Sequence, residues 1–224
     1  MTLSASGVVG FGSFLTYLGY GYLDTWHGAA TLALLPCFVG GLWLSHRRVM
    51  ATAAVSDADT SWRSLLRPAN STQWRTIAGF GRGCLLTAAV GMMGAGSTIL
   101  VIGMTQVFVA TDLTFMGMTR DQLDSINPRL IPLIAHDRAG FGGGVATAGL
   151  LLFASVWHGT PSRSLWQALL IAGIAGWSTA IGVHPLIGYT DAGHLVPAVT
   201  GAFLFFAGLL LTQSSMCTEA AGAI

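Results

Sequence analysis

Two short stretches of the chain share a pattern of residues that can hold a metal ion. Residues 21–28 read GYLDTWHG and residues 188–195 read GYTDAGHL, so both contain Gly-Tyr-x-Asp-x-x-His. Residues three apart lie on one face of a helix, and carboxylate with imidazole is a common ligand pair for divalent metals. The repeated motif therefore predicts two helix starts that can each contribute metal ligands.

A third stretch places the same two residue types together, because HDRAGFGG opens another apolar segment with His136 and Asp137. Three helices that begin with Asp and His and run in the same direction would bring these groups to one end of a bundle. We predict that a divalent metal ion binds there. The candidate ligands are Asp24, His27, His136, Asp137, His184, Asp191 and His194.

Further polar residues are expected to support these ligands. A metal-bound His usually donates its second ring nitrogen to a neighbouring acceptor. Asp112 would complete the ring of polar groups, and Arg138 would neutralise the adjacent Asp137 through an ion pair. His184 would lean towards His194 across the short turn between the last two apolar segments. The expected supporting residues are Asp112, Arg138, Tyr22, Tyr189 and Trp26.

Each of these residues also has a simpler explanation. Asp is a preferred N-cap of helices, and Tyr and Trp are common at membrane interfaces. Such roles explain single positions, but they do not explain why His follows Asp at the same spacing twice. Ionisable groups at membrane depth are candidates for function by default, so the metal site remains the preferred hypothesis.

Haem is another use of paired histidines. His27 and His46 stand in one apolar segment, and His136 and His158 in another. At about 1.5 Å per residue, these pairs are ~28 and ~33 Å apart along a helix, which would place two haems at the surfaces of the bundle. Haem b is therefore less favoured than a metal ion.

The composition indicates a membrane protein. The 224 residues are 53% hydrophobic and only 8% charged, with no lysine, whereas about 25% of the residues of a soluble domain are charged. Such a chain cannot cover itself with polar side chains in water. We predict a single polytopic membrane domain over residues 1–224, with the lipid bilayer as its main partner. No basic run suggests nucleic acid.

Six apolar segments are long enough to span a bilayer, which takes about 20 residues. Backbone groups in lipid must be satisfied within the segment, so each span is a helix. We predict an all-α bundle of six transmembrane helices, in which 21–45 and 188–212 form a parallel internal repeat. The predicted spans are 5–23, 27–45, 80–106, 134–157, 165–183 and 193–212.

Two local signals refine this picture. Thr119 and Gln122 form a capping-box pattern, which predicts the start of a helix. Asn127-Pro128 should end that helix, so a short interfacial helix is expected at 120–126. The glycine-rich runs GMMGAG (91–96) and GFGGG (140–144) predict a close approach of two helices.

The arginines suggest an orientation. With six spans, seven of the ten arginines lie on the side of the two termini and three on the other side. Arginine is enriched in cytoplasmic loops. We therefore expect a multi-pass protein of the cell membrane with both termini in the cytoplasm and the Asp/His cluster on the extracytoplasmic face.

These observations favour a metal site of the oxidoreductase type, in this chain or as a subunit of a membrane oxidoreductase. One alternative is a non-catalytic subunit of a larger membrane complex or a homo-oligomer, because short loops and Gly-rich helices suit packing against partners. A small cation transporter is the second alternative, but the middles of the spans carry almost no ionisable residues.

Overall fold

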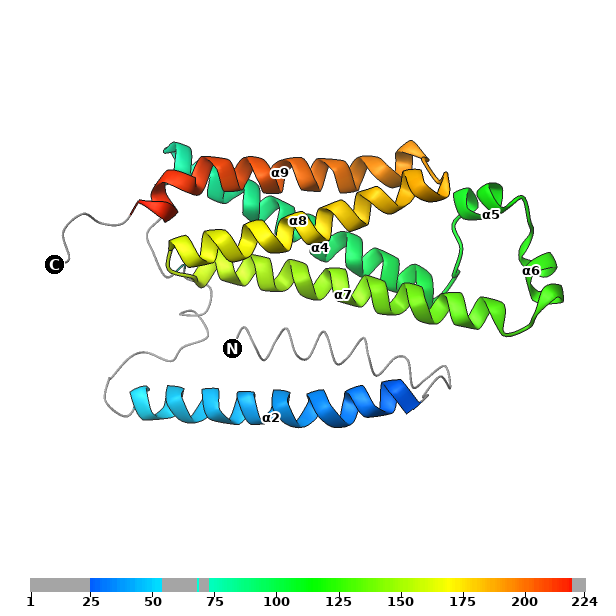
Figure 1. Ribbon diagram of the computed structural model, residues 1–224, viewed down its shortest axis with the longest axis horizontal. Coiled ribbons are helices and arrows are strands. Elements are labelled where there is room, and N and C mark those ends of the chain that lie inside the picture. Colours follow the sequence, from blue (N-terminus) through cyan, green and yellow to red (C-terminus); the bar gives the residue numbers. More distant parts are fainter. Residues whose placement is uncertain (1–24, 54–67, 69–72, 219–224) are drawn as a thin grey trace.

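The computed structural model describes residues 25–53, 68 and 73–218. These residues form seven helices and no strand (Figure 1), so the all-α prediction is confirmed for this part of the chain. The helices are α2 (Thr25–Ala53), α4 (Ile77–Met104), α5 (Ala110–Met116), α6 (Arg120–Ile126), α7 (Leu130–His158), α8 (Arg163–Ile187) and α9 (Ala192–Cys217).

Four helices, α4, α7, α8 and α9, are long and apolar enough to cross a membrane. They contain 25 to 29 residues, which at about 1.5 Å per residue gives roughly 38–44 Å, more than the ~30 Å of hydrocarbon. They correspond to the predicted third to sixth spans. The predicted span 5–23 lies outside the described residues, and the predicted span 27–45 falls within α2, which is not one of these four helices, so the count of six spans stays a prediction.

Several helix boundaries differ from the predicted ones, and two of them affect the candidate site. α7 begins at Leu130, so His136 lies almost two turns inside the helix rather than at its start. The helix can begin early because Pro132 falls in its first turn, where a missing N–H costs no hydrogen bond. α8 continues through Pro185 and ends at Gly188, whose φ of 77° is the left-handed conformation typical of helix ends.

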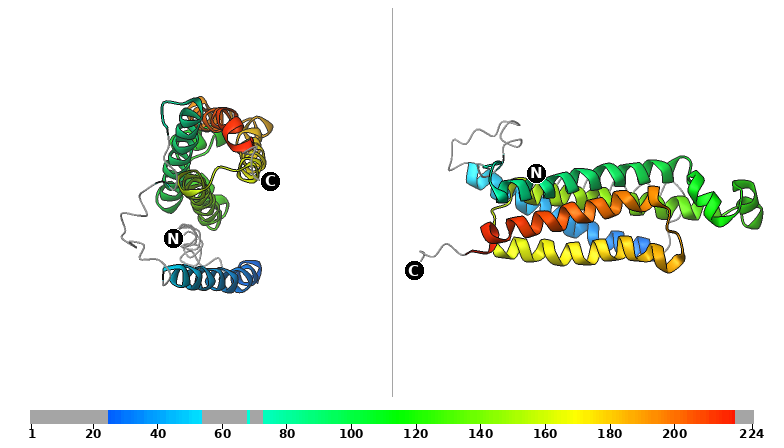
Figure 2. Two further views of the ribbon diagram at one scale, coloured as in Figure 1. Left: turned by 90° about the vertical axis from the view of Figure 1, so that its left-hand side faces the viewer. Right: turned by 90° about the horizontal axis from the view of Figure 1, so that it is seen from above.

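The four long helices pack in the order α7, α4, α9 and α8, as the end-on view in Figure 2 shows. Helices in lipid associate through close packing and interhelical hydrogen bonds rather than through the hydrophobic effect. One such bond joins α8 to α9, because the indole Nε1 of Trp166 donates to the carbonyl of Leu209 at 2.9 Å. The most enclosed residues of the core between these helices are Leu85, Ala88, Ala89 and Leu209.

The glycine-rich runs bring α4 and α7 into backbone contact, as predicted. A Cβ atom added to Gly96 would meet the backbone nitrogen of Ala146 at 2.3 Å, and one added to Gly142 would meet that of Leu100 at 2.4 Å. No residue with a side chain fits at these distances. The glycines therefore set the separation of the two helices.

The connection between α4 and α7 forms a tip on the bundle. α6 is the predicted short helix, and its capping box is present: the Gln122 backbone N–H donates to the Thr119 hydroxyl at 3.3 Å, and the Thr119 N–H donates to Gln122 Oε1 at 2.8 Å. α5 was not predicted. The segment between α4 and α5 packs with α6 against α7 through a second apolar cluster, which includes Phe108, Leu123 and Ile131.

The two ends of the bundle differ in charge. We call the end that carries the tip, where α7 and α9 begin, the acidic end, because all five described aspartates lie there: Asp112, Asp121, Asp124, Asp137 and Asp191. We call the other end, where α4 and α8 begin, the basic end. Figure 1 shows that α2, α7 and α9 all start at the acidic end and run in the same direction.

Candidate functional site at the acidic end

Asp112 is the centre of the polar groups at the acidic end. It belongs to the first turn of α5 and is only 5% exposed. Its Oδ2 accepts a hydrogen bond from the backbone N–H of Val109 at 2.9 Å, which caps the start of α5. A buried carboxylate is costly unless it is paired and hydrogen-bonded, so its other contacts decide whether this end is stable.

Arg138 provides the opposite charge. Its Nη2 lies 2.7 Å from Asp112 Oδ2, and its guanidinium also lies over the ring of Phe108, 5.8 Å from the centroid. The ion pair ties α5 to α7 across 26 residues of sequence. Arg138 thus pairs with Asp112 in place of the predicted partner Asp137, whose carboxylate lies against His136 instead.

Tyr189 connects the same carboxylate to the turn between α8 and α9. Its hydroxyl donates to Asp112 Oδ1 at 2.9 Å and lies 3.0 Å from the hydroxyl of Thr111. Burial raises the pKa of the Tyr189 phenol above its ordinary value; the hydrogen bond with Thr111 lowers it, and the carboxylates of Asp112 and Asp191 raise it further. Tyr189 is therefore held in its protonated form as a hydrogen-bond donor.

Two histidine rings pack against Tyr189. The ring centroids of His184 and His194 are 5.4 Å apart, and each lies near the phenol ring, at 6.2 and 5.0 Å. The last turn of α8 supplies one imidazole and the first turn of α9 the other. Their proximity follows from the tight turn at Gly188 between the two helices.

One nitrogen of this pair has no partner in the part of the chain that the structure describes. His184 Nδ1 is buried and makes no hydrogen bond with any described residue. An unsatisfied buried polar atom costs about 1–3 kcal/mol, so such an atom usually marks a place where water, an ion or a ligand binds. Since His194 lies beside it, a bound group there can be shared by both imidazoles.

Asp191 has the role of a helix cap. Its Oδ1 accepts the backbone N–H of His194 at 3.0 Å. The Asp-x-x-His spacing therefore has a structural purpose in this copy of the motif, since the aspartate fixes the first turn of α9 and with it the position of the histidine.

The pair of His136 and Asp137 adopts a different arrangement. His136 Nδ1 lies 2.9 Å from Asp137 Oδ1. The imidazole is buried, whereas the side chain of Asp137 is 71% exposed. Among the described residues, no three His, Cys, Asp or Glu side chains come together as a metal-binding group. The described candidates thus provide the His184–His194 pair and, apart from it, the His136–Asp137 pair.

The first copy of the motif falls largely outside this description. Tyr22 and Asp24 lie outside the described residues, and Trp26 and His27 belong to α2 with side chains that are likewise not described. The predicted contribution of these residues, and the internal repeat, stay predictions.

Sequence reasoning missed Phe115 and Thr111 of α5, which hold Tyr189. The rings of Phe115 and Tyr189 are 4.8 Å apart. The available signal was Asp112 three residues after Val109, the spacing at which a carboxylate caps a helix start.

No protein-family model, curated protein or solved structure matches the chain. The chemistry of the acidic end therefore has to be argued from its own residues.

Proposed function

We propose that this chain is an integral protein of the cell membrane that binds a divalent metal ion at its acidic end, with His184 and His194 as two of the ligands. The observation that carries the proposal is the packing of these two imidazoles in one place, with a buried nitrogen that has no hydrogen-bond partner among the described residues. Neutral imidazole is a common ligand of zinc, copper, iron and nickel.

The separation of the rings suits a shared ion. Metal–nitrogen bonds of about 2.0–2.1 Å in a tetrahedral site place the centroids of two imidazoles roughly 5 Å apart, and the observed value is 5.4 Å. Two further ligands are needed. We infer that they come from Asp24 and His27, because α2 begins at the acidic end, or from water.

The surroundings favour an oxidoreductase-type site, in this chain or as a subunit of a membrane oxidoreductase. Tyr189 is a protonated donor beside both imidazoles, and Asp112 with Arg138 holds it in place. A metal site with an open position next to a fixed proton donor can bind and polarise a small or lipid-soluble substrate. We place this site on the extracytoplasmic face, since most arginines stand on the opposite side.

A structural subunit of a larger membrane complex is the second candidate. It is favoured by the pairing of Asp112, because an ion pair with two further hydrogen bonds can serve as a structural tie between α5, α7 and the α8–α9 turn. In this case the acidic end needs no metal, and the apolar surface of α8, most of which is exposed, would face lipid or a partner.

The test is the metal content of the full chain purified in mild detergent, measured by elemental mass spectrometry before and after loading with zinc. We expect about one equivalent per chain, as one shared site requires, and its loss in the double variant His184→Ala/His194→Ala. His158→Ala, an exposed histidine at the basic end, is the matched control and should keep the metal. Metal that is absent, or that the double variant retains, would leave the structural subunit as the better account.

The variant Asp24→Ala/His27→Ala tests the remaining ligands. If the start of α2 completes the site, this variant should also lose its metal. Unchanged metal content would show that the two histidines and water suffice.

A further inference from the structure

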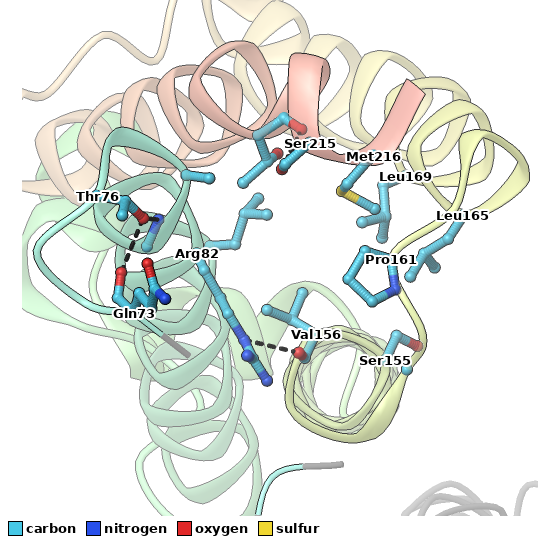
Figure 3. A pocket seen from close by; sticks show the side chains of 15 residues that line it. Gln73, Thr76, Arg82, Ser155, Val156, Pro161, Leu165, Leu169, Ser215 and Met216 are labelled. Carbon is cyan, nitrogen blue, oxygen red and sulfur yellow. Dashed lines mark hydrogen bonds between the residues drawn. The ribbon is translucent and has the colours of Figure 1, made fainter. Parts of the chain in front are cut away.

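The basic end contains a cavity between the four long helices. Its volume is about 200 Å³, and it opens where α4 and α8 begin and α7 and α9 end. Figure 3 shows Arg82 along one side of it, with Pro161, Leu165 and Leu169 on the other. The short connection between α7 and α8 borders it, because Gly159 and Pro161 are among the residues that line it.

The lining is amphipathic. The apolar side chains of Leu85, Val156 and Leu169 line the cavity. Leu85 and Val156 belong to the hydrophobic core of the bundle, and Leu169 packs against that core. Polar side chains of exposed or half-buried residues lie around them: Gln73, Thr76, Arg82, Ser155 and Ser215. An occupant of this cavity must therefore be apolar over most of its length and polar at one end.

Arg82 holds its position through the end of α7. Its Nε donates to the carbonyl of Val156 at 3.1 Å and its Nη2 to the carbonyl of Trp157 at 3.0 Å. These carbonyls belong to the last turn of α7, which has no further helical partners for them. The arrangement fixes a permanent positive charge beside the cavity, with the rings of Trp74 and Trp157 each 5.9 Å away.

The described charged residues at this end are all arginines. Arg75 lies just before the start of α4, and Arg163 is the first residue of α8. Both are therefore at the same end of the bundle as Arg82. All the described aspartates lie at the opposite end of the bundle, so within the described residues the basic end carries cations and no carboxylate. An anionic group is the electrostatic complement of this end.

We propose that the cavity binds an anionic phospholipid. Part of one acyl chain occupies the apolar interior, and the phosphate lies at the mouth near Arg82. Basic pockets between transmembrane helices bind anionic lipid headgroups. A volume of about 200 Å³ is too small to enclose a whole lipid, so the rest of the molecule lies along the outer surface of the bundle.

The alternative source of the same chemistry is a free phosphate ion. A small hydrated anion would complement the charge of Arg82, but it would leave the apolar lining around Leu85 and Leu169 uncovered. An acyl chain covers that lining and brings the anion to the same position. The two sources differ in one property that can be measured, which is whether an acyl chain is required for binding.

Lipid retention by the full chain in detergent, followed by native mass spectrometry, tests the proposal. Phosphatidylglycerol and phosphatidylcholine with identical acyl chains are the two probes, and inorganic phosphate is the competitor. We expect one phosphatidylglycerol per chain, clear preference over phosphatidylcholine, and no displacement by excess inorganic phosphate. Equal retention of both lipids, or displacement by phosphate alone, would overturn the proposal.

Two variants locate the site. Arg82→Gln should weaken phosphatidylglycerol binding about fivefold, the effect of one cationic group near an anionic lipid. Arg163→Gln, at the same end but outside the cavity lining, should have a smaller effect. Equal losses would mean that the overall charge attracts the lipid and that the cavity does not bind it.

Because Arg82 also caps α7, its removal can destabilise the bundle, and a second pair of variants avoids this difficulty. Leu169→Trp fills the cavity without a change of charge and should reduce phosphatidylglycerol retention at least as strongly. Ile171→Trp, on the same helix but 69% exposed, is its control and should bind normally. Normal binding by Leu169→Trp would show that the lipid does not occupy this cavity.

Discussion

The two ends of the bundle use their charged residues in different ways. At the acidic end the buried carboxylate of Asp112 is bound by Arg138, Tyr189 and a backbone N–H, so side chains from three parts of the chain close on one another. At the basic end Arg82 binds backbone carbonyls of α7, and a cavity stays open beside it. The comparison teaches that one bundle can carry a closed polar cluster at one surface and an amphipathic pocket at the other.

The difference has a chemical consequence. A closed cluster positions its members to within hydrogen-bonding distance, which is what a metal ligand or a proton donor needs. An open pocket with one fixed cation instead selects its occupant by charge and by apolar length. This difference is why we propose ion binding at the acidic end and lipid binding at the basic end.

The largest expected effect on stability comes from Asp112→Ala. Removal of one partner of a buried ion pair costs about 3–5 kcal/mol, and we expect about 3 kcal/mol here, the lower part of that range, because the Arg138 side chain is 26% exposed. The thermal unfolding midpoint in detergent, followed by circular dichroism, measures the loss. Phosphatidylglycerol retention at the basic end should not change while the bundle is folded.

Asp124→Ala is the matched control, because Asp124 is an exposed aspartate of α6 at the same end. It should change stability by less than about 0.5 kcal/mol. Equal effects of the two substitutions would show that the Asp112 ion pair does not organise the acidic end.

A smaller effect is expected from Gly96→Ala, which acts between the two ends. The new methyl group would collide with the backbone of α7 at Ala146, and overpacking typically costs about 1–3 kcal/mol. Gly91→Ala, on the same helix with open space around it, should not destabilise the protein, since Ala is the better helix former. If both variants behave alike in thermal unfolding, the close contact of α4 and α7 is not what holds the bundle together.

The smallest effect concerns the ionisation of Tyr189. Its pKa is raised above the ordinary value of 10.0, so the folded protein keeps the phenol protonated at pH values where the unfolded chain already ionises. The stability that this donor contributes is fully present below pH 10 and falls as the pH rises through the folded pKa. The difference between the near-ultraviolet titrations of the native chain and Tyr189→Phe isolates this residue from the other three tyrosines.

Ionisation of Tyr189 at or below its ordinary pKa would contradict the hydrogen bond to Asp112. The Tyr189→Phe variant itself should lose about 1 kcal/mol, the value of one hydrogen bond. It should keep both histidine rings in place, because the ring of Phe can pack as Tyr189 does.

The sequence predicted the elements that depend on local signals. Apolar length located α4, α8 and α9 to within a few residues, and the capping box at Thr119 predicted α6 with its observed limits. The start of α7 was predicted at 134, whereas the helix begins at Leu130 and holds Pro132 in its first turn, where a proline is tolerated.

The contacts of the acidic end could be predicted only in part. Because the turn at Gly188 is short, the proximity of His184 to His194 could be predicted from the sequence. Asp112 and Arg138 are far apart in the chain and meet only because α4 and α7 pack closely through Gly96 and Gly142. Tertiary packing of this kind, like the cavity at the basic end, leaves no local pattern in the sequence.

The most direct test of the central claim is X-ray absorption spectroscopy at the zinc edge of the metal-loaded chain, because outer-shell scattering reports imidazole ligands. The account predicts scattering from at least two imidazoles in the native protein, lost in His184→Ala/His194→Ala and kept in His158→Ala. Failure to retain zinc, or a spectrum without imidazole scattering, would contradict the claim that the acidic end is a metal site.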